Sequence, residues 1–314
     1  MKKILKIAGR ISLVILIILV LFLLVIFIYN KIMLKQEKPL REPLGQMVMV
    51  DGHNMSIYTK GEGAHTLVFM SGAGIPSPII DYKSVYSLLS DDYRIVVVEK
   101  FGYGFSDVID SERSLETILR QDREALSKAG IDGKLILCPH SMSGLEAILW
   151  AQIYPDEIEA IVGLDMSLPQ TYNDDISGDS NSIDFYSILR ETGLLRLGLS
   201  DSFLPDTLTQ KEKDIYMALA FEKFSNKTAN HEKQHIDEAV ELINSNPKPD
   251  VPMLMFVSNG EDTGVENWGD IQKDYASELT NAKIIELDCG HMIHRVKQEQ
   301  IAEDTREFIE SLNG

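Results

Sequence analysis

A serine that could act as a nucleophile follows a short apolar run in the middle of the chain. Residues 135–138 are apolar, as in a strand buried on both faces, and residues 144–154 carry apolar side chains at helical spacing. Ser141 lies between them. A serine at a sharp strand-to-helix turn exposes its hydroxyl, and backbone N–H groups of the helix start point at the group it attacks. The pattern predicts a nucleophile elbow, although a chance serine in an ordinary turn would look similar.

The sequence around Ser141 resembles the elbow of the α/β-hydrolase fold superfamily, which reads G-x-S-x-G and often G-H-S-M-G-G. Residues 139–144 read PHSMSG, so Pro139 and Ser143 replace the two framework glycines. Serine is small, and proline fixes only its own φ, near a value that a strand end can use. We interpret the segment as a variant elbow.

Two further segments resemble that family. After the strand expected over 66–70, the chain reads Ser71-Gly72-Ala73 where the family has His-Gly-x. This resemblance implies that the backbone N–H groups of Ala73 and Met142 form the oxyanion hole, which does not depend on their side chains. Residues 99–107 resemble the D-x-x-G-x-G-x-S-D segment of many α/β hydrolases, with Glu99 in place of the first Asp.

Gly72 and Gly74 after a strand are also typical of a dinucleotide-binding loop. Ser77 occupies the third glycine position of that loop, and prolines 76 and 78 interrupt the start of any helix. No CxxC pair and no H-E-x-x-H motif occurs in the sequence. We therefore expect neither a cofactor nor a metal ion.

The resemblance places the other triad residues after later strands. Gly290-His291 matches the G-H signature of the catalytic histidine. Asp262 follows the strand expected over 252–257, where relatives have G-x-x-D, with Asn259 in the glycine position. Asp165 follows the preceding strand, from which some related hydrolases supply the acid. We expect Asp262 to be the acid and keep Asp165 as the alternative.

These residues imply a serine hydrolase that cleaves an ester or an amide, a carboxylic ester before the others. His291 would take the proton of Ser141, the acid would hold the imidazole tautomer, and water would release the acyl-enzyme. Serine in place of Asp as nucleophile disfavours dehalogenase and epoxide hydrolase chemistry. The alternatives are a prolyl-type aminopeptidase, an acyltransferase, or a non-catalytic protein that uses the same pocket for binding.

The elements that must position these residues occur in the order that the fold requires. A hairpin is expected over 47–59, and six strands are expected over 66–70, 94–98, 135–138, 158–164, 252–257 and 282–287, with helices over 114–129 and 296–312. The pattern predicts an α/β domain over 47–314 with a mostly parallel central sheet flanked by helices.

The interval of about 168–248 contains no convincing buried strand. Residues 173–181 are polar and typical of a loop, and helices are expected over 183–199, 209–224 and 231–244. Related hydrolases carry a helical lid at this point, so the resemblance implies a lid that roofs the pocket. Its apolar residues serve either the pocket or helix packing.

The first 34 residues predict a membrane anchor. The 20 residues between Arg10 and Lys31 carry no charge, and a span of about 11–29 is long enough, at ~1.5 Å per residue, for a ~30 Å hydrocarbon layer. No small-residue cleavage site follows, so we expect an uncleaved signal anchor. Basic residues on the two sides are nearly balanced; a short basic N-terminus kept inside favours a single-pass protein of the cell membrane with its domain outside. Residues 35–46, with two prolines, predict a tether.

The rest of the chain is strongly acidic. The formal charge is −18, and the first 45 residues hold eight basic and two acidic residues, which leaves 22 basic and 46 acidic residues beyond them. Such a domain repels nucleic acid and anionic lipid. We expect a small-molecule substrate, and the bilayer as a partner through the span alone; the oligomeric state is open. In the strand arrangement that the resemblance implies, Cys138 and Cys289 are not on neighbouring strands, so no disulfide is expected.

Overall fold

An eight-stranded sheet forms the centre of the part of the chain that the structure, a computed structural model, describes: residues 2–172 and 185–312. The strand order is β1-β2-β4-β3-β5-β6-β7-β8. The β1–β2 and β2–β4 pairs are antiparallel and all others are parallel. The carboxyl ends of β3 to β8 therefore meet at one edge, where open α/β sheets bind ligands. The strands are Gln46–Val50 (β1), His53–Lys60 (β2), Thr66–Met70 (β3), Arg94–Glu99 (β4), Leu135–Ser141 (β5), Ile158–Met166 (β6), Met253–Val257 (β7) and Ala282–Glu286 (β8).

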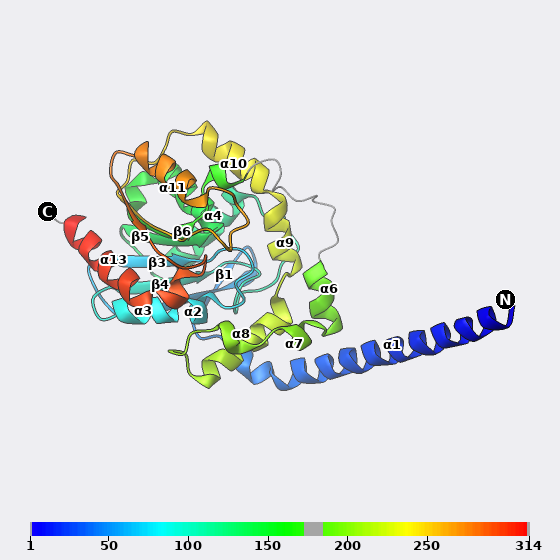
Figure 1. The fold of residues 1–314 in the computed structure, drawn as a ribbon. Helices are drawn as coiled ribbons and strands as arrows, with labels where there is room; N and C mark the ends of the chain where they lie inside the picture. The colour runs from blue at the N-terminus through cyan, green and yellow to red at the C-terminus, as the bar shows by residue number, and fades with distance from the viewer. Residues whose placement is uncertain (1, 173–184, 313–314) are drawn as a thin grey trace.

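Helices cover both faces of this sheet (Figure 1). Alternate residues of β3 enter different cores, because successive strand side chains point to opposite faces: Leu67 joins one cluster and Val68 the other. The first face is covered by α2 (Pro78–Asp81), α3 (Lys83–Leu89), α12 (Ile293–Val296) and α13 (Gln298–Leu312), and the second by α4 (Leu115–Lys128), α5 (Ser143–Ile153) and α11 (Trp268–Ser277). A turn, η2 (Pro155–Glu157), precedes β6. The expected α/β arrangement is confirmed.

The segment between β6 and β7 is helical. It comprises η3 (Pro169–Thr171), α6 (Phe185–Thr192), α7 (Leu195–Gly198), η4 (Asp201–Phe203), α8 (Gln210–Lys223), α9 (Lys227–Gln234) and α10 (Ile236–Ser245). The helix expected over 183–199 is interrupted at Gly193, whose φ of 88° suits glycine. The helix expected over 231–244 is interrupted at His235, and the polar stretch 173–181 lies outside the described residues. We call α6 to α10 the lid segment.

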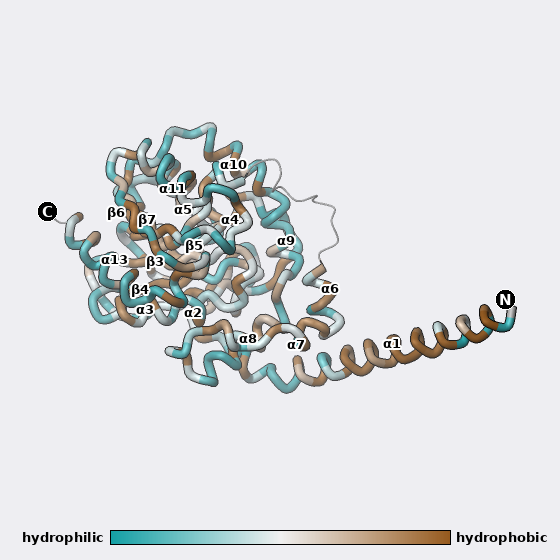
Figure 2. The backbone as a smooth tube through the Cα atoms, viewed as in Figure 1, coloured by the Kyte–Doolittle hydropathy of each residue, from teal (hydrophilic) through white to brown (hydrophobic). Residues whose placement is uncertain are grey.

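The N-terminal helix α1 (Lys2–Gln36) extends away from the domain (Figure 1). Within the described residues it is the one helix long and apolar enough to cross a membrane, by length and composition. Its apolar side chains are almost all exposed. The hydropathy colouring shows most of this helix as a brown stretch of the backbone tube (Figure 2). The stretch expected as a tether, 35–46, is the end of α1, the turn η1 (Lys38–Arg41) and the start of β1. The connection is thus short and largely ordered.

Candidate active site

Ser141 stands at the junction of β5 and α5. Its backbone has a left-handed φ of 53°, and the pairing of β5 with β6 shifts register between His140 and Ser141. Helix α5 begins two residues later, at Ser143, with Met142 at its N-cap. The strand therefore turns sharply into the helix, and the serine is displaced from the regular strand conformation. This is the local geometry that the sequence predicted for an elbow.

Two glycines allow the backbone to crowd around this turn. A Cβ on Gly72 would lie 2.6 Å from Cβ of Ser141, and a Cβ on Gly144 would lie 2.2 Å from the carbonyl oxygen of Ser167. The loop after β3 therefore lies directly against Ser141. Ala73 follows Gly72 in this loop, so both segments expected to supply oxyanion N–H groups, those of Ala73 and Met142, are beside the serine.

Ser143, which occupies a framework glycine position, fills that position with hydrogen bonds. Its hydroxyl accepts from the backbone N–H of His140 at 3.0 Å and lies 2.9 Å from the carbonyl oxygens of Met70 and of His140. The side chain is almost fully buried. Ser143 thus ties the elbow to β3, and its hydroxyl points into the framework.

His291 and Asp165 form a close pair at the same edge of the sheet. Nδ1 of His291 lies 2.6 Å from Oδ2 of Asp165. The other oxygen of Asp165 accepts from the backbone N–H of Ser258 at 2.7 Å and from Nε1 of Trp268 at 2.8 Å. The carboxylate is fully buried, whereas the imidazole is 17% exposed. Like Ser141, Asp165 has a positive φ, 51°. Three donors on two oxygens fix the carboxylate toward Nδ1 of the histidine.

Asp262, the acid that we expected, occupies a different position. Its side chain is exposed. Its Oδ2 lies close to the backbone of Gly290, since a Cβ added to that glycine would be 2.0 Å from this oxygen. The carboxylate thus lies against the backbone next to His291, while Asp165 takes the hydrogen-bonding position at Nδ1. Of the two candidate acids, Asp165 is the one whose carboxylate is hydrogen bonded to His291. The cause is the path of the loop after β7, which carries Asp262 outward and brings Trp268 onto Asp165.

Trp268 is a site residue that the sequence analysis missed. Besides its bond to Asp165, its ring contacts His291 edge-on, with centroids 5.7 Å apart. It begins α11 after Asn267, which has a left-handed φ of 59°. The sequence offered one signal. Trp268 is one of two tryptophans in the chain, and it lies six residues after Asp262.

A second buried histidine lies behind the first. Nε2 of His294 lies 2.6 Å from Oδ2 of Asp81, and Nε and Nη2 of Arg295 donate to Oδ1 of the same carboxylate at 2.9 and 2.5 Å. Burial alone would raise the pKa of Asp81, but Arg295 and His294 outweigh it and hold that pKa below its usual value. Burial lowers the pKa of His294. The group links α2, after the oxyanion loop, to α12, after His291.

His140 lies between the two histidines. Its ring centroid is 4.7 Å from that of His291 and 4.7 Å from that of His294. Burial lowers the pKa of His140 well below its usual value, so the ring is neutral at pH 7. Nε2 lies 3.2 Å from the carbonyl oxygen of His291, to which a neutral ring with Nε2–H donates. His140 therefore supports the loop that carries His291. Sequence analysis used it only as part of the elbow motif.

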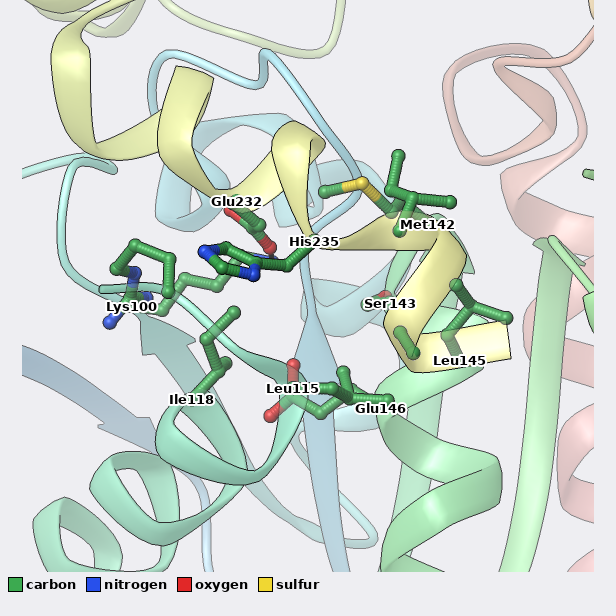
Figure 3. A pocket seen from close by; sticks show the side chains of 12 residues that line it. Lys100, Leu115, Ile118, Met142, Ser143, Leu145, Glu146, Glu232 and His235 are labelled. Atoms are coloured by element: carbon green, nitrogen blue, oxygen red, sulfur yellow. Dashed lines mark hydrogen bonds and ion pairs between the residues drawn. The ribbon is translucent and has the colours of Figure 1, made fainter. Parts of the chain in front are cut away.

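A small cavity of about 20 Å³ lies beside the elbow helix under α9 and α10, and both apolar and charged side chains line it (Figure 3). Met142 and Leu145 line one side, and Lys100 lines the other (Figure 3). Lys100 forms a buried ion pair with Glu232, which also accepts from the hydroxyl of Tyr103 at 2.9 Å. A volume of this size holds about one water molecule.

Two buried carboxyl groups, Asp122 and Glu146, interact near this cavity. Burial raises the pKa of Asp122 to about 6, and burial together with Asp122 raises that of Glu146 well above its usual value. Both shifts favour the protonated forms. Glu99, at the position of the family's Asp, is a third buried carboxyl; burial raises its pKa to about 7, and it accepts from the backbone N–H of Phe105 at 2.9 Å.

Within residues 2–172 and 185–312, no group of three or more His, Cys, Asp or Glu side chains is arranged to hold a metal ion. Cys138 and Cys289 are free thiols, and burial raises the pKa of both. The arrangement described above therefore offers a serine, a histidine and a buried carboxylate as its chemically active groups.

Comparisons with known proteins identify relatives of the whole chain. No family model matches it. YbdG of Bacillus subtilis (strain 168), described as an uncharacterised protein, is 36% identical over 296 residues, 90% of this chain and 91% of YbdG. Similar solved structures include Cfl2 from Burkholderia cenocepacia, with a TM-score of 0.68 and 20% identity over 84% of this chain and 94% of that one.

Two further solved structures carry enzyme names. An epoxide hydrolase from Bacillus megaterium has a TM-score of 0.67 and 15% identity, covering 84% of this chain and all of that one. A putative lipase from Acinetobacter baumannii has a TM-score of 0.64 and 16% identity, covering 90% of this chain and 96% of that one. At such low identity these structures show a shared fold and do not distinguish the reactions.

Proposed function

The chain belongs to the α/β-hydrolase fold superfamily, and from that premise we propose that it is a serine hydrolase with the triad Ser141, His291 and Asp165. The observation that carries the proposal is the 2.6 Å contact between Asp165 and His291, at the sheet edge where the elbow presents Ser141. A carboxylate in this position holds the proton on Nδ1, which leaves Nε2 free to accept one. Chain order, serine then acid then histidine, is that of the superfamily.

The reaction that fits these groups is hydrolysis of a carboxylic ester. Oγ of Ser141 attacks the carbonyl carbon while Nε2 of His291 takes its proton, and the N–H groups of Ala73 and Met142 stabilise the oxyanion. The alcohol leaves with the proton from His291, and a bond from the acyl carbon to Oγ remains. Water then attacks this acyl-enzyme, gives its proton to His291, and releases the acid and the serine hydroxyl.

Serine as the nucleophile separates this proposal from the epoxide hydrolases with the same fold. Their chemistry uses an Asp at the position of Ser141, as the family resemblance implies. A hydroxyl activated by His291 attacks an acyl carbon readily. An ester is favoured over an epoxide for that reason alone, and the identity of the ester is open to a substrate panel.

Active-site labelling by a fluorophosphonate tests the proposal on the full-length chain in membranes. The parent should be labelled and should hydrolyse a p-nitrophenyl ester. Ser141→Ala should lose labelling and about 10⁴ or more of kcat. Ser143→Ala is the matched control: it removes buried hydrogen bonds, at a cost of about 1–2 kcal/mol of stability, and should still be labelled. Failure to label the parent, or labelling of folded Ser141→Ala, would refute the assignment.

We also propose that α1 is an uncleaved anchor in the cell membrane, with the domain on the outer side. The length, apolar composition and exposure of α1 support an anchor. Orientation rests on the usual retention of a short basic N-terminus in the cytoplasm. Protease added to intact cells without a wall should digest the domain beyond residue 45. Protection equal to that of a cytosolic marker would place it inside.

A further inference from the structure

The anchor helix and the lid segment are joined by direct contacts. Asn30 of α1 is almost fully buried; its Nδ2 donates to the carbonyl oxygen of Arg190 at 3.2 Å, and its Oδ1 accepts from Nε of Arg196 at 2.7 Å. Nη1 and Nη2 of Arg196 donate to the two oxygens of Glu37, each at 2.7 Å. The lid segment therefore binds the end of α1 at Asn30 and the residue that follows the helix, Glu37, about two helical turns further along.

Gly193 brings the lid backbone itself onto α1. A Cβ at this position would lie 2.5 Å from Cβ of Asn30 and 3.1 Å from the carbonyl oxygen of Ile26. Only a residue without a side chain permits this approach. The connection between α6 and α7 therefore packs against α1 at Ile26 and Asn30. Figure 1 shows α6 and α7 beside α1.

The charges of α1 locate a bilayer boundary at this contact. Arg10 and Lys31 enclose 20 uncharged residues, about 30 Å of helix, which equals the thickness of a hydrocarbon layer. If Arg10 lies at one boundary, Lys31 lies at the other. Asn30 precedes Lys31 by one residue, so lid residues that touch Asn30 are at the depth of the lipid headgroups.

The lid exposes large apolar side chains next to this contact. Ile188 on α6 is 42% exposed and Leu197 on α7 is 65% exposed, and Phe185 and Tyr186 at the start of α6 are exposed as well. Exposed Lys31 and Lys35 of α1 lie at the same level. Apolar and aromatic side chains beside lysines are the composition of surfaces that lie in a membrane interface.

We propose that α6 and α7 rest on the bilayer where α1 leaves it, with Ile188 and Leu197 inserted at the boundary between headgroups and acyl chains. The inference rests on the proposed anchor. It adds a second membrane contact, whereas the acidic composition of the domain had led us to expect contact through the span alone. Because the contact is apolar, the domain's negative charge does not oppose it as it would oppose binding to an anionic surface. The lid is thereby held at the membrane.

Site-directed fluorescence on the full-length chain in phosphatidylcholine vesicles tests this contact. A single cysteine is placed at Ile188 or Leu197 in a Cys289→Ala background and labelled with an environment-sensitive dye; Cys138 is buried. Val296→Cys is the matched control, because Val296 is 59% exposed on α12, which packs on α3 and α13 away from α1. Each protein is measured in vesicles with plain and with brominated acyl chains.

Dye at 188 and 197 should emit at shorter wavelength and lose at least half of its intensity in brominated vesicles, whereas dye at 296 should be unaffected. Equal behaviour at all three positions would overturn the inference. So would crosslinking between copies through 188 or 197 without bromine quenching, since a second chain would then cover this face. Fluorophosphonate labelling of the same samples reports the proposed function separately: quenching without labelling would leave the membrane contact standing and remove the hydrolase assignment.

Discussion

Oδ2 of Asp81 lies 2.6 Å from Nε2 of His294, and neither side chain is exposed. Arg295 binds the other oxygen, so α2 is held to α12 by a buried charge network between the oxyanion loop and His291. Removing one partner of a buried pair leaves the remaining charges without compensation. This network connects the two loops that would supply the oxyanion hole and the histidine of the proposed triad.

Substitution of Asp81 should therefore destabilise the fold strongly. We expect Asp81→Asn to lower the free energy of unfolding by about 3–5 kcal/mol, because His294 and Arg295 lose a buried anion. Asp92→Asn is the control; Asp92 pairs with Arg306 on the surface, and its loss should cost about 1 kcal/mol or less. Thermal unfolding of both variants gives the comparison. Equal small losses would show that the buried network contributes nothing.

The choice of triad acid is tested by paired variants. Asp165→Asn should lower kcat by about 10⁴, because His291 loses the anion that orients its tautomer. Asp262→Asn should keep kcat within about threefold, since its exposed side chain is not bound to the imidazole. Hydrolysis of a p-nitrophenyl ester by both proteins decides between them once each is shown to be folded. The reverse ranking would restore Asp262 as the acid.

The carboxyl pair Asp122 and Glu146 should make the fold less stable at alkaline pH. Both pKa values are raised in the folded chain, that of Asp122 to about 6, so folding favours the protonated forms. The stabilisation is complete below the usual carboxyl pKa and declines as pH rises through the raised values. Burial is the largest cause of both shifts and Glu232 adds to both, whereas Lys100 opposes both and Arg113 opposes that of Asp122.

Glu146→Gln keeps a hydrogen-bond donor to Asp122 without a proton to lose. Relative to the parent, it should gain on the order of 1–3 kcal/mol at pH 9 and little at pH 5. Glu116→Gln, on the exposed side of α4, should show no such dependence on pH. Denaturant unfolding at the two pH values measures the difference. A gain that is the same at pH 5 and pH 9 would contradict the raised pKa values of Asp122 and Glu146.

The Arg196 and Glu37 pair should couple the lid segment to α1. Both side chains are largely buried, and the contact has two parallel hydrogen bonds. In a double-mutant cycle with Arg196→Met and Glu37→Gln, we expect a coupling energy of about 1–3 kcal/mol from thermal unfolding of the full-length chain in detergent. Additive effects of the two substitutions would mean that the pair carries no interaction energy.

The strands were the most predictable part of the fold. The apolar runs that form β3 and β7 are short and are bounded by polar or turn residues. In an alternating pattern of strands and helices, such runs predict strands buried on both faces. The sharp turn at Ser141 could be predicted because the residues before and after it determine the turn locally. The strands and the turn depend on residues that are close in sequence, so a single sequence is enough to predict them.

The acid was not determined locally. Asp165 and Asp262 both follow strands that end at the same edge of the sheet, and sequence spacing treats them alike. The outcome depends on where the loop after β7 runs and on the indole of Trp268, a tertiary contact over about a hundred residues. The ion pair between Arg196 and Glu37 also joins segments that are far apart in the sequence. Contacts between distant segments leave no periodic signal in one sequence.

The left-handed backbone at Ser141 and at Asp165 has a thermodynamic consequence. For a residue with a Cβ this conformation costs on the order of 1 kcal/mol, and glycine would avoid that cost. Two such residues at the ends of adjacent strands remove a noticeable fraction of a folding free energy of about 5–15 kcal/mol. Backbone conformation alone would favour glycine at both positions. The chain instead carries this strain at the two positions that would supply the hydroxyl and the carboxylate of the proposed triad.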